Sequence, residues 1–238
     1  MAMKQNPIYK KEVLQQNRNY ILPLMLTALN AVLSILVVIN MYSLQAGARQ
    51  TGEIAYGDFL RLYSLMAGLE FLLLLLLMPA LTASAITGER ERRTLGVILT
   101  TGLTPAELVR GKLLAALDLV LLLLASSAPS LATVYIYGGV GLLQLLAVIV
   151  FYFVTALYLA AIGIAASAFS HSTFGASTLS YVLTILSVAL FIFLFYMREE
   201  LGVGLGTMWI CSLVFMLLWT TILLYFSIWR LKLPRVCA

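Results

Sequence analysis

The chain has 238 residues, of which 62% are hydrophobic and only 11% are charged, and its formal net charge is +5. So few polar side chains cannot cover a water-soluble globule, so the composition predicts an integral membrane protein and excludes a soluble domain. A helical span needs roughly 20 apolar residues to cross a hydrocarbon core about 30 Å thick. This length therefore holds six spans and leaves no room for a separate catalytic domain.

The residues before the first apolar segment predict a helix on the membrane surface. Pro7 suits the first position of a helix. Tyr9 and Lys11 then fall on opposite faces, while Ile8 falls outside the apolar stripe. We therefore expect residues 1–19 to form an interfacial helix on the inner leaflet. An ordinary basic flank with no further role is the alternative.

Six apolar segments follow, and together they predict an all-α integral membrane protein with a single transmembrane domain over residues 1–238. The first segment is read as a retained anchor, because its apolar core is longer than that of a signal peptide. The expected spans are Tyr20–Tyr42, Leu62–Thr87, Leu113–Tyr137, Leu142–Phe169, Ala176–Met197 and Thr207–Trp229.

The basic residues predict the orientation. With the N-terminus in the cytoplasm, only Arg49, Arg61 and Arg198 of the 15 lysines and arginines lie outside. Cytoplasmic loops of membrane proteins carry the excess of basic residues, so both termini are expected in the cytoplasm. The net positive charge then reflects orientation and does not indicate a nucleic-acid partner.

The loop between the second and third spans, residues 88–107, carries the densest run of charge in the chain. Behind its Glu/Arg cluster, Leu95, Ile98 and Leu99 have the i, i+3, i+4 spacing of a short helix with an apolar stripe. Gly102 can end that helix. The sequence therefore predicts a short cytoplasmic helix in the loop.

The next helix has a clear start signal. Thr104 and Glu107 have the spacing of a capping box, and Pro105 stands at the first helical position. We expect this helix to continue into the third span. The alternative is that the loop has no further role: its basic residues would only set the membrane orientation, and the capping box would only start the helix.

Three parts of the chain together form a recognisable pattern. In and after the charged loop it comprises Gly88-Glu89-Arg90-Glu91, Thr94-Leu95, Leu99-Thr100, Thr104-Pro105, Glu107-Leu108 and Gly111-Lys112. Near the N-terminus it comprises Asn6-Pro7-Ile8 and Lys11-Glu12, and before the fifth span the small-residue-rich Gly163–Ser170 segment. This pattern resembles the ABC-2 type permease family, the transmembrane subunits of ATP-driven ABC exporters.

The resemblance implies a permease subunit without its own ATPase, located in the cytoplasmic (plasma) membrane of a bacterium. Gly111-Lys112 lacks the upstream glycine and the hydroxyl residue of a phosphate-binding loop. The chain is therefore not expected to be an enzyme or to bind a cofactor or metal. ATP and magnesium would be bound by a separate pair of ATPase subunits.

The family also pairs two permeases, as a homodimer or a heterodimer, and seats the short helix of this loop in an ATPase groove. Carried onto this sequence, Leu95 and Leu99 would anchor the contact, and the charged residues would orient it. The residues assigned to this coupling helix contact are Glu89, Arg90, Glu91, Arg92, Thr94, Leu95 and Leu99.

Two acidic residues and a proline inside the expected spans are further candidates for a functional role. Intramembrane acids are functional hypotheses by default. Glu70 could pair with Arg61, line the translocation path or form an inter-helix or inter-subunit polar contact. Asp118 is expected to meet a nearby base or a hydroxyl of a neighbouring helix. Pro79 permits a bend or a gating hinge in the second span.

Small residues in the fourth span have a structural interpretation. Gly163 and Ser167, four positions apart, allow close approach of another helix. Packing within one subunit is the role we expect for them. The two cysteines, Cys211 and Cys237, predict neither a disulfide nor a metal site.

Two other classes of protein compete with the permease. An intramembrane protease would need ligands or acids at one depth, and the chain's acids and its single histidine, His171, are scattered. A secondary transporter driven by an ion gradient would suit two inverted halves of three spans. The charged loop has no counterpart in the second half, which favours the permease. We expect export of an amphipathic or hydrophobic cargo, such as a peptide, lipid or drug-like compound.

The orientation can be tested with cysteines placed at Arg92, Lys232 and Arg49. Impermeant thiol reagents should reach the first two only from the cytoplasm and the third only from outside, because basic residues mark the inner side. Labelling of the Arg92 position from outside intact cells would overturn the assignment.

Overall fold

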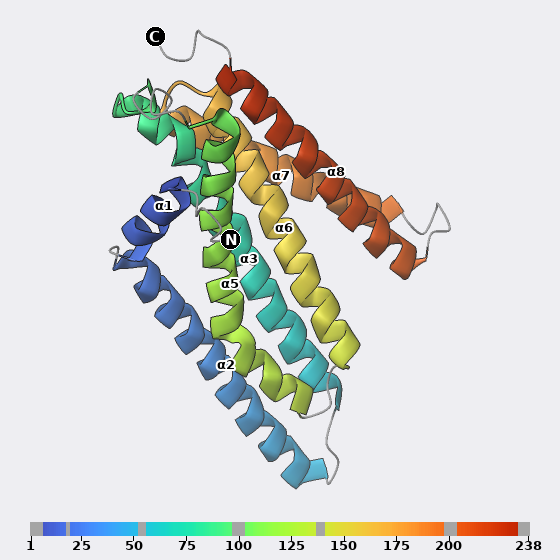
Figure 1. Ribbon diagram of the computed structural model, residues 1–238. Helices are drawn as coiled ribbons and strands as arrows, with labels where there is room; N and C mark the ends of the chain where they lie inside the picture. Colours follow the sequence, from blue (N-terminus) through green and yellow to red (C-terminus); the bar gives the residue numbers. More distant parts are fainter. Residues whose placement is uncertain are drawn as a thin grey trace, which may run out of the picture. The chain divides into compact units, whose positions relative to one another are not determined.

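A computed structural model describes residues 7–17, 20–51, 56–96, 103–136, 141–197 and 204–232. Long α-helices make up nearly all of this part of the chain, and no strand occurs in it (Figure 1). The helices are α1 (Pro7–Asn17), α2 (Ile21–Thr51), α3 (Tyr56–Glu91), α5 (Pro105–Ile136), α6 (Leu142–Phe169), α7 (Thr173–Met197) and α8 (Leu205–Lys232).

The helices begin where the sequence signals predict. α1 and α5 each start at a proline, whose missing N–H costs nothing in the first turn. The capping box before α5 is confirmed. The Thr104 N–H donates to Glu107 Oε2 (2.9 Å), and the Glu107 N–H donates to Thr104 Oγ1 (3.2 Å). The short helix expected around Leu99 falls mainly on residues 97–102, outside the described residues.

The C-terminus of α3 ends in a Schellman turn at a residue that is not glycine. Arg93 has a φ of 57°, in the left-handed region. The Thr94 N–H donates to the Glu89 carbonyl oxygen (2.9 Å), and the Arg93 N–H donates to that of Arg90 (3.0 Å). These two bonds define the motif. A side chain in this conformation costs about 1 kcal/mol that glycine would avoid.

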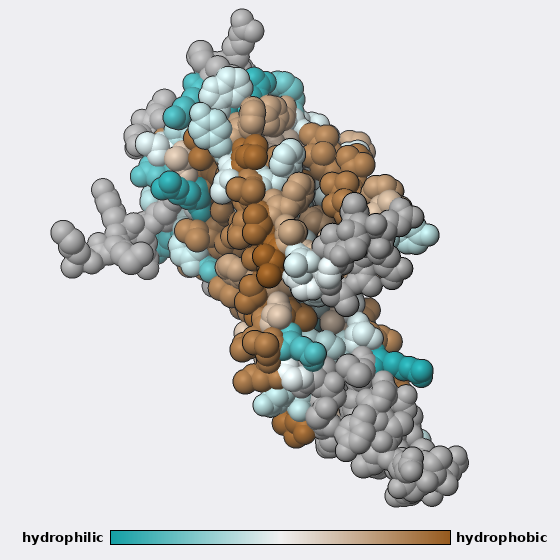
Figure 2. All heavy atoms as spheres, turned by 90° about the vertical axis from the view of Figure 1, so that its right-hand side faces the viewer, coloured by the Kyte–Doolittle hydropathy of each residue, from teal (hydrophilic) through white to brown (hydrophobic). Residues whose placement is uncertain are grey.

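Four of the described helices are long and apolar enough to cross a membrane: Tyr63–Glu91, Leu142–Phe169, Thr173–Met197 and Gly206–Lys232. Hydrophobic side chains cover much of the face seen in Figure 2. The other two expected spans lie within α2 and α5. In α2 the stretch Pro23–Ile39 is apolar, and not every side chain of α2 and α5 lies among the described residues. The count of six spans therefore stays a prediction.

The described residues fall into two compact units. Unit 1 contains α1 to Val13, residues 75–118 of α3 and α5, and residues 153–232 of α6 to α8. Unit 2 contains residues 14–74 of α1 to α3 and residues 119–152 of α5 and α6. Each unit therefore combines helical segments that are far apart in the sequence.

In unit 1, α6 packs closely on α3 at Gly163 and Ser167, as the small-residue spacing predicted. A Cβ atom on Gly163 would lie 1.8 Å from Thr82 Oγ1 and 3.2 Å from the Ala83 nitrogen. The buried Ser167 Oγ accepts hydrogen bonds from the backbone N–H groups of Ile86 (2.8 Å) and Thr87 (2.9 Å). The contact joins two helices of one chain, so the expected role in packing within the subunit is confirmed.

Pro79 and Pro129 lie inside the continuous helices α3 and α5. Pro79 cannot donate to the carbonyl one turn earlier, which loosens the local ladder of hydrogen bonds. In the same stretch of α3, the Tyr181 hydroxyl of α7 donates to the Leu76 carbonyl oxygen (2.8 Å). Such a bond supports the backbone near a proline. Pro79 as a gating hinge stays a prediction.

The α3–α6 contact can be tested with Gly163→Ala. The new methyl group would overlap Thr82 Oγ1 and would also lie 2.8 Å from Thr82 Cβ, so the two helices must move apart. We expect the free energy of unfolding to fall by about 1–3 kcal/mol. The thermal midpoint in detergent would measure this loss.

Gly68→Ala is the matched control, because a Cβ atom at Gly68 of α3 meets nothing within 4 Å. It should leave stability unchanged or raise it by up to about 1 kcal/mol, since alanine favours helix over glycine. Equal effects of the two substitutions would contradict the close approach at Gly163.

Candidate functional site

The helix ends of unit 1 enclose a small hydrophobic core. It joins Ile8 of α1, Leu108 and Val109 of α5, and Leu231 of α8 to Leu95, which follows α3. Leu95 is only 3% exposed. Burying a leucine this fully contributes about 2 kcal/mol, so the segment after α3 is fixed to the helices around it. Ile8, although outside the apolar stripe predicted for α1, is the α1 residue in this core.

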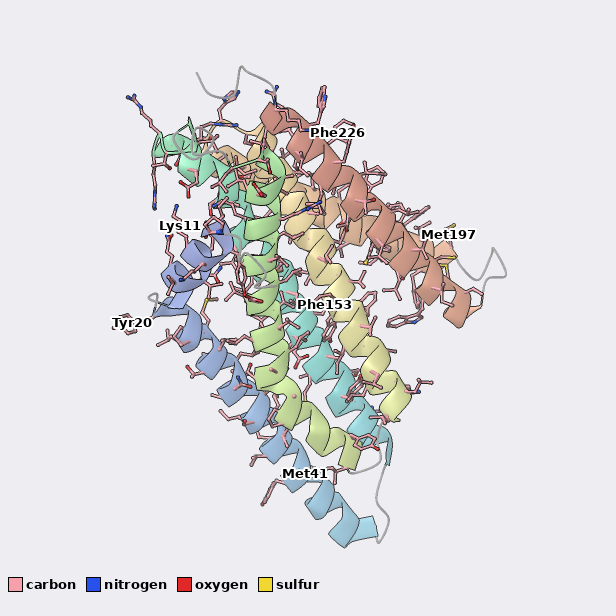
Figure 3. All side chains as sticks on the ribbon, viewed as in Figure 1. Lys11, Tyr20, Met41, Phe153, Met197 and Phe226 are labelled. Carbon is pink, nitrogen blue, oxygen red and sulfur yellow. The ribbon has the colours of Figure 1, made fainter. Side chains whose placement is uncertain are left out.

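Beside this core lies a charged network made of Lys11 and Glu12 of α1, Glu89 of α3 and Lys112 of α5. Lys11 Nζ lies 2.8 Å from Glu89 Oε1, and Lys112 Nζ lies 2.6 Å from Glu12 Oε1 and 3.8 Å from Glu89 Oε1. Figure 3 labels Lys11 on α1. The Lys112 side chain is only 7% exposed. Two cations therefore face two carboxylates, and the network is electrically balanced.

Tyr9 forms a further link between α1 and α5. Its hydroxyl donates to Asp118 Oδ2. This hydrogen bond to a carboxylate, more than any other cause, raises the pKa of the Tyr9 phenol above its ordinary value. Tyr9 therefore stays protonated, and stays a donor, at physiological pH. The expectation that Asp118 meets a hydroxyl from a neighbouring helix is confirmed.

Arg90 and Glu91 at the end of α3 form hydrogen bonds with backbone groups at the adjacent ends of α6 and α7. The Arg90 guanidinium donates to the carbonyl oxygen of Ser170, just past the end of α6. Glu91 Oε1 accepts from the backbone N–H (2.7 Å) and the hydroxyl (3.0 Å) of Thr173, the first residue of α7. A cation at a helix C-terminus and an anion at an N-terminus both match the helix dipole. Glu91 and Arg90 thus join α3 to the α6–α7 turn.

The structure brings most of the predicted coupling residues together, with roles that differ from one another. Thr94 donates through its hydroxyl to the Glu89 carboxylate, which closes the turn after α3. Arg92 and Arg93 are exposed. Leu99 lies outside the described residues. Leu95 is part of the chain's own core, so its observed contact is intramolecular.

Sequence reasoning gave no role to Lys11, Glu12 and Lys112. The first two stand next to each other near the N-terminus, and Lys112 is 100 positions beyond Glu12. All three fall in the segments that carry the family resemblance, and that was the available signal. Pairing at such separations depends on how the helices pack, which spacing along the chain does not reveal.

Glu70 belongs to unit 2. The structure gives it no ion pair with Arg61 or with another described residue. Groups of three or more metal-ligating side chains that could hold a metal ion are likewise not found among the described residues.

These helices and their charged junction define a multi-pass helical membrane protein in which α1 and the segment after α3 are fixed to the ends of the spans. The sequence model of the ABC-2 family transporter protein matches residues 7–203. Because this match covers most of the chain, the protein belongs to the ABC-2 family of transporters, the membrane permeases of ABC transporters. A comparison with curated proteins gave no match.

Lys112→Met tests the charged network. The substitution keeps most of the apolar side-chain volume and removes the charge that faces Glu12 and Glu89. Removing one partner of a buried ion pair typically costs about 3–5 kcal/mol. Because Glu12 is partly exposed, we expect the free energy of unfolding to fall by about 3 kcal/mol. Thermal unfolding would measure the loss, and hydrogen exchange should become faster in α1.

Lys10→Met removes an exposed charge from α1, the helix whose hydrogen exchange is measured, and serves as the control. Its effect should stay within about 0.5 kcal/mol. If Lys112→Met left both stability and α1 exchange unchanged, the Lys112 ammonium group would not be what holds α1.

Proposed function

We propose that this permease exports an amphipathic or hydrophobic cargo using ATP hydrolysed by a separate ATPase, and that the segment after α3 receives the ATPase. The chain would contribute no catalytic residue. ATP and magnesium would be held by a pair of ATPase subunits, and a second permease, identical or different, would complete the pathway. The N- and C-termini would face the cytoplasm.

One observation carries this proposal: residues 89–95 are connected to four other helices of unit 1. Glu89 reaches α1 and α5, Arg90 the end of α6, and Glu91 the start of α7. A push on this segment would therefore displace the ends of several spans together. A solvated linker between two spans would need none of these contacts.

The structure supports two different roles for the coupling residues: some would contact the ATPase, and others would transmit its movement to the helices. Exposed Arg92 and Arg93 are available to a partner. Glu89, Arg90, Glu91, Thr94 and Leu95 make intramolecular contacts, so they would transmit movement. In this proposal Leu95 holds the segment to the hydrophobic core of unit 1 and does not fill the ATPase groove.

A pair of variants separates docking from transmission. Arg92→Glu reverses an exposed charge and should weaken ATPase association by about 1 kcal/mol, or roughly fivefold, without changing thermal stability. Glu91→Ala removes the carboxylate at the start of α7 and should leave the ATPase bound while lowering cargo transport per ATP hydrolysed. Copurification, ATPase assays and transport in proteoliposomes would measure these effects.

Lys232→Glu provides the same charge reversal at an exposed position on α8 and should leave ATPase association unchanged. The proposal fails if Arg92→Glu and Lys232→Glu behave alike. It also fails if the purified chain moves cargo down an ion gradient with no ATPase present, since that outcome identifies a secondary transporter.

A further inference from the structure

Glu70 is a carboxyl group enclosed in the interior of unit 2. Its exposure is 0%, and Met66 and Leu74, one turn before and after it on α3, are 0% and 1% exposed. Neither Oε1 nor Oε2 has a hydrogen-bond partner among the described residues. Nearby, Phe71 stacks with Phe151 and Tyr152 of α6, at ring separations of 6.1 and 6.3 Å.

Among the described residues, the groups around Glu70 supply no positive charge. On its own helix the neighbouring titratable group is Tyr63, whose hydroxyl is also buried and has no hydrogen-bond partner in the described part of the chain. α6 contributes Tyr152 and α5 contributes Ser127. The Pro23–Ile39 stretch of α2 contains neither a charged residue nor a tyrosine.

Two of these hydroxyl groups donate their protons to backbone carbonyl oxygens and not to Glu70. Tyr152 donates to the Ala67 carbonyl oxygen (2.5 Å), and Ser127 donates to that of Leu124 (3.2 Å). Each hydroxyl oxygen still has lone pairs that can accept. Tyr152 and Ser127 can therefore offer Glu70 an acceptor while their own protons bond elsewhere, which suits a carboxyl group that carries its own proton.

An ionised carboxylate with no partner in an apolar interior costs several kcal/mol, and such groups are neutralised instead. We propose that Glu70 is an intramembrane proton-binding site, occupied by a proton while unit 2 is packed as in this structure. The bound proton makes the carboxyl a donor toward the Ser127 and Tyr152 oxygens. A conformational change that exposed Glu70 to water would release it. This inference does not depend on the proposed ATPase.

Infrared spectroscopy of the full-length protein in lipid nanodiscs at neutral pH tests the proposal. The spectrum should contain the carbonyl band of a protonated carboxylic acid, and ¹³C-labelled glutamate should shift this band while ¹³C-labelled aspartate should not. The labelling uses the unmodified chain, so the test does not depend on a variant that folds.

Two variants assign the band to one residue. Glu70→Gln, which keeps the shape and a neutral head group, should abolish the band. Asp118→Asn is the control: it removes another acid of a membrane-embedded helix, one whose carboxylate already accepts the Tyr9 hydroxyl, and it should leave the band intact.

The opposite results would overturn the proposal. A spectrum in which every glutamate gives only ionised-carboxylate bands means that Glu70 carries no proton. A protonated band that appears only after choline replaces sodium and potassium means that a monovalent cation occupies the site. A band that remains in Glu70→Gln belongs to another residue.

Discussion

The carboxylate of Glu89 must be neutralised where it lies, because its side chain is only 12% exposed and sits among the packed ends of helices. Lys11 and Lys112 provide the positive charge, and they come from two different helices. A single carboxylate thereby fixes α3, α1 and α5 relative to one another within unit 1. Lys112 is itself nearly buried and needs Glu12, which brings α1 into the network a second time.

The rest of the junction depends on this arrangement. With α3 in place, the adjacent Arg90 and Glu91 reach the end of α6 and the start of α7. The Schellman turn at Arg93 then directs the chain so that Leu95 enters the core. Closer to the middle of α3, Gly163 and Ser167 hold α6 against it. Polar contacts at the helix ends and close backbone packing between helices therefore act on the same pair of elements.

Local features of this fold could be read from the sequence, whereas the contacts between helices could not. The start of α5, the apolar limits of α6 and the close approach at Gly163 follow from rules that span a few residues. The family resemblance located the coupling residues, but it did not predict which way their side chains point. Whether Leu95 points outward or inward depends on α1 and α8, which are distant in the sequence. Ile8 was misplaced for the same reason, since its partners are not on its own helix.

The attachment of α1 also constrains how the protein is made. The contacts that hold α1 join it to residues 78, 100 and 109 positions further along the chain. A ribosome that has released only α1 and α2 has produced none of these partners. The N-terminal helix must therefore wait, undocked, until α3 and α5 have been inserted. Its docking follows the synthesis of all these partners and completes the charged junction of unit 1, although α1 itself is synthesised before them.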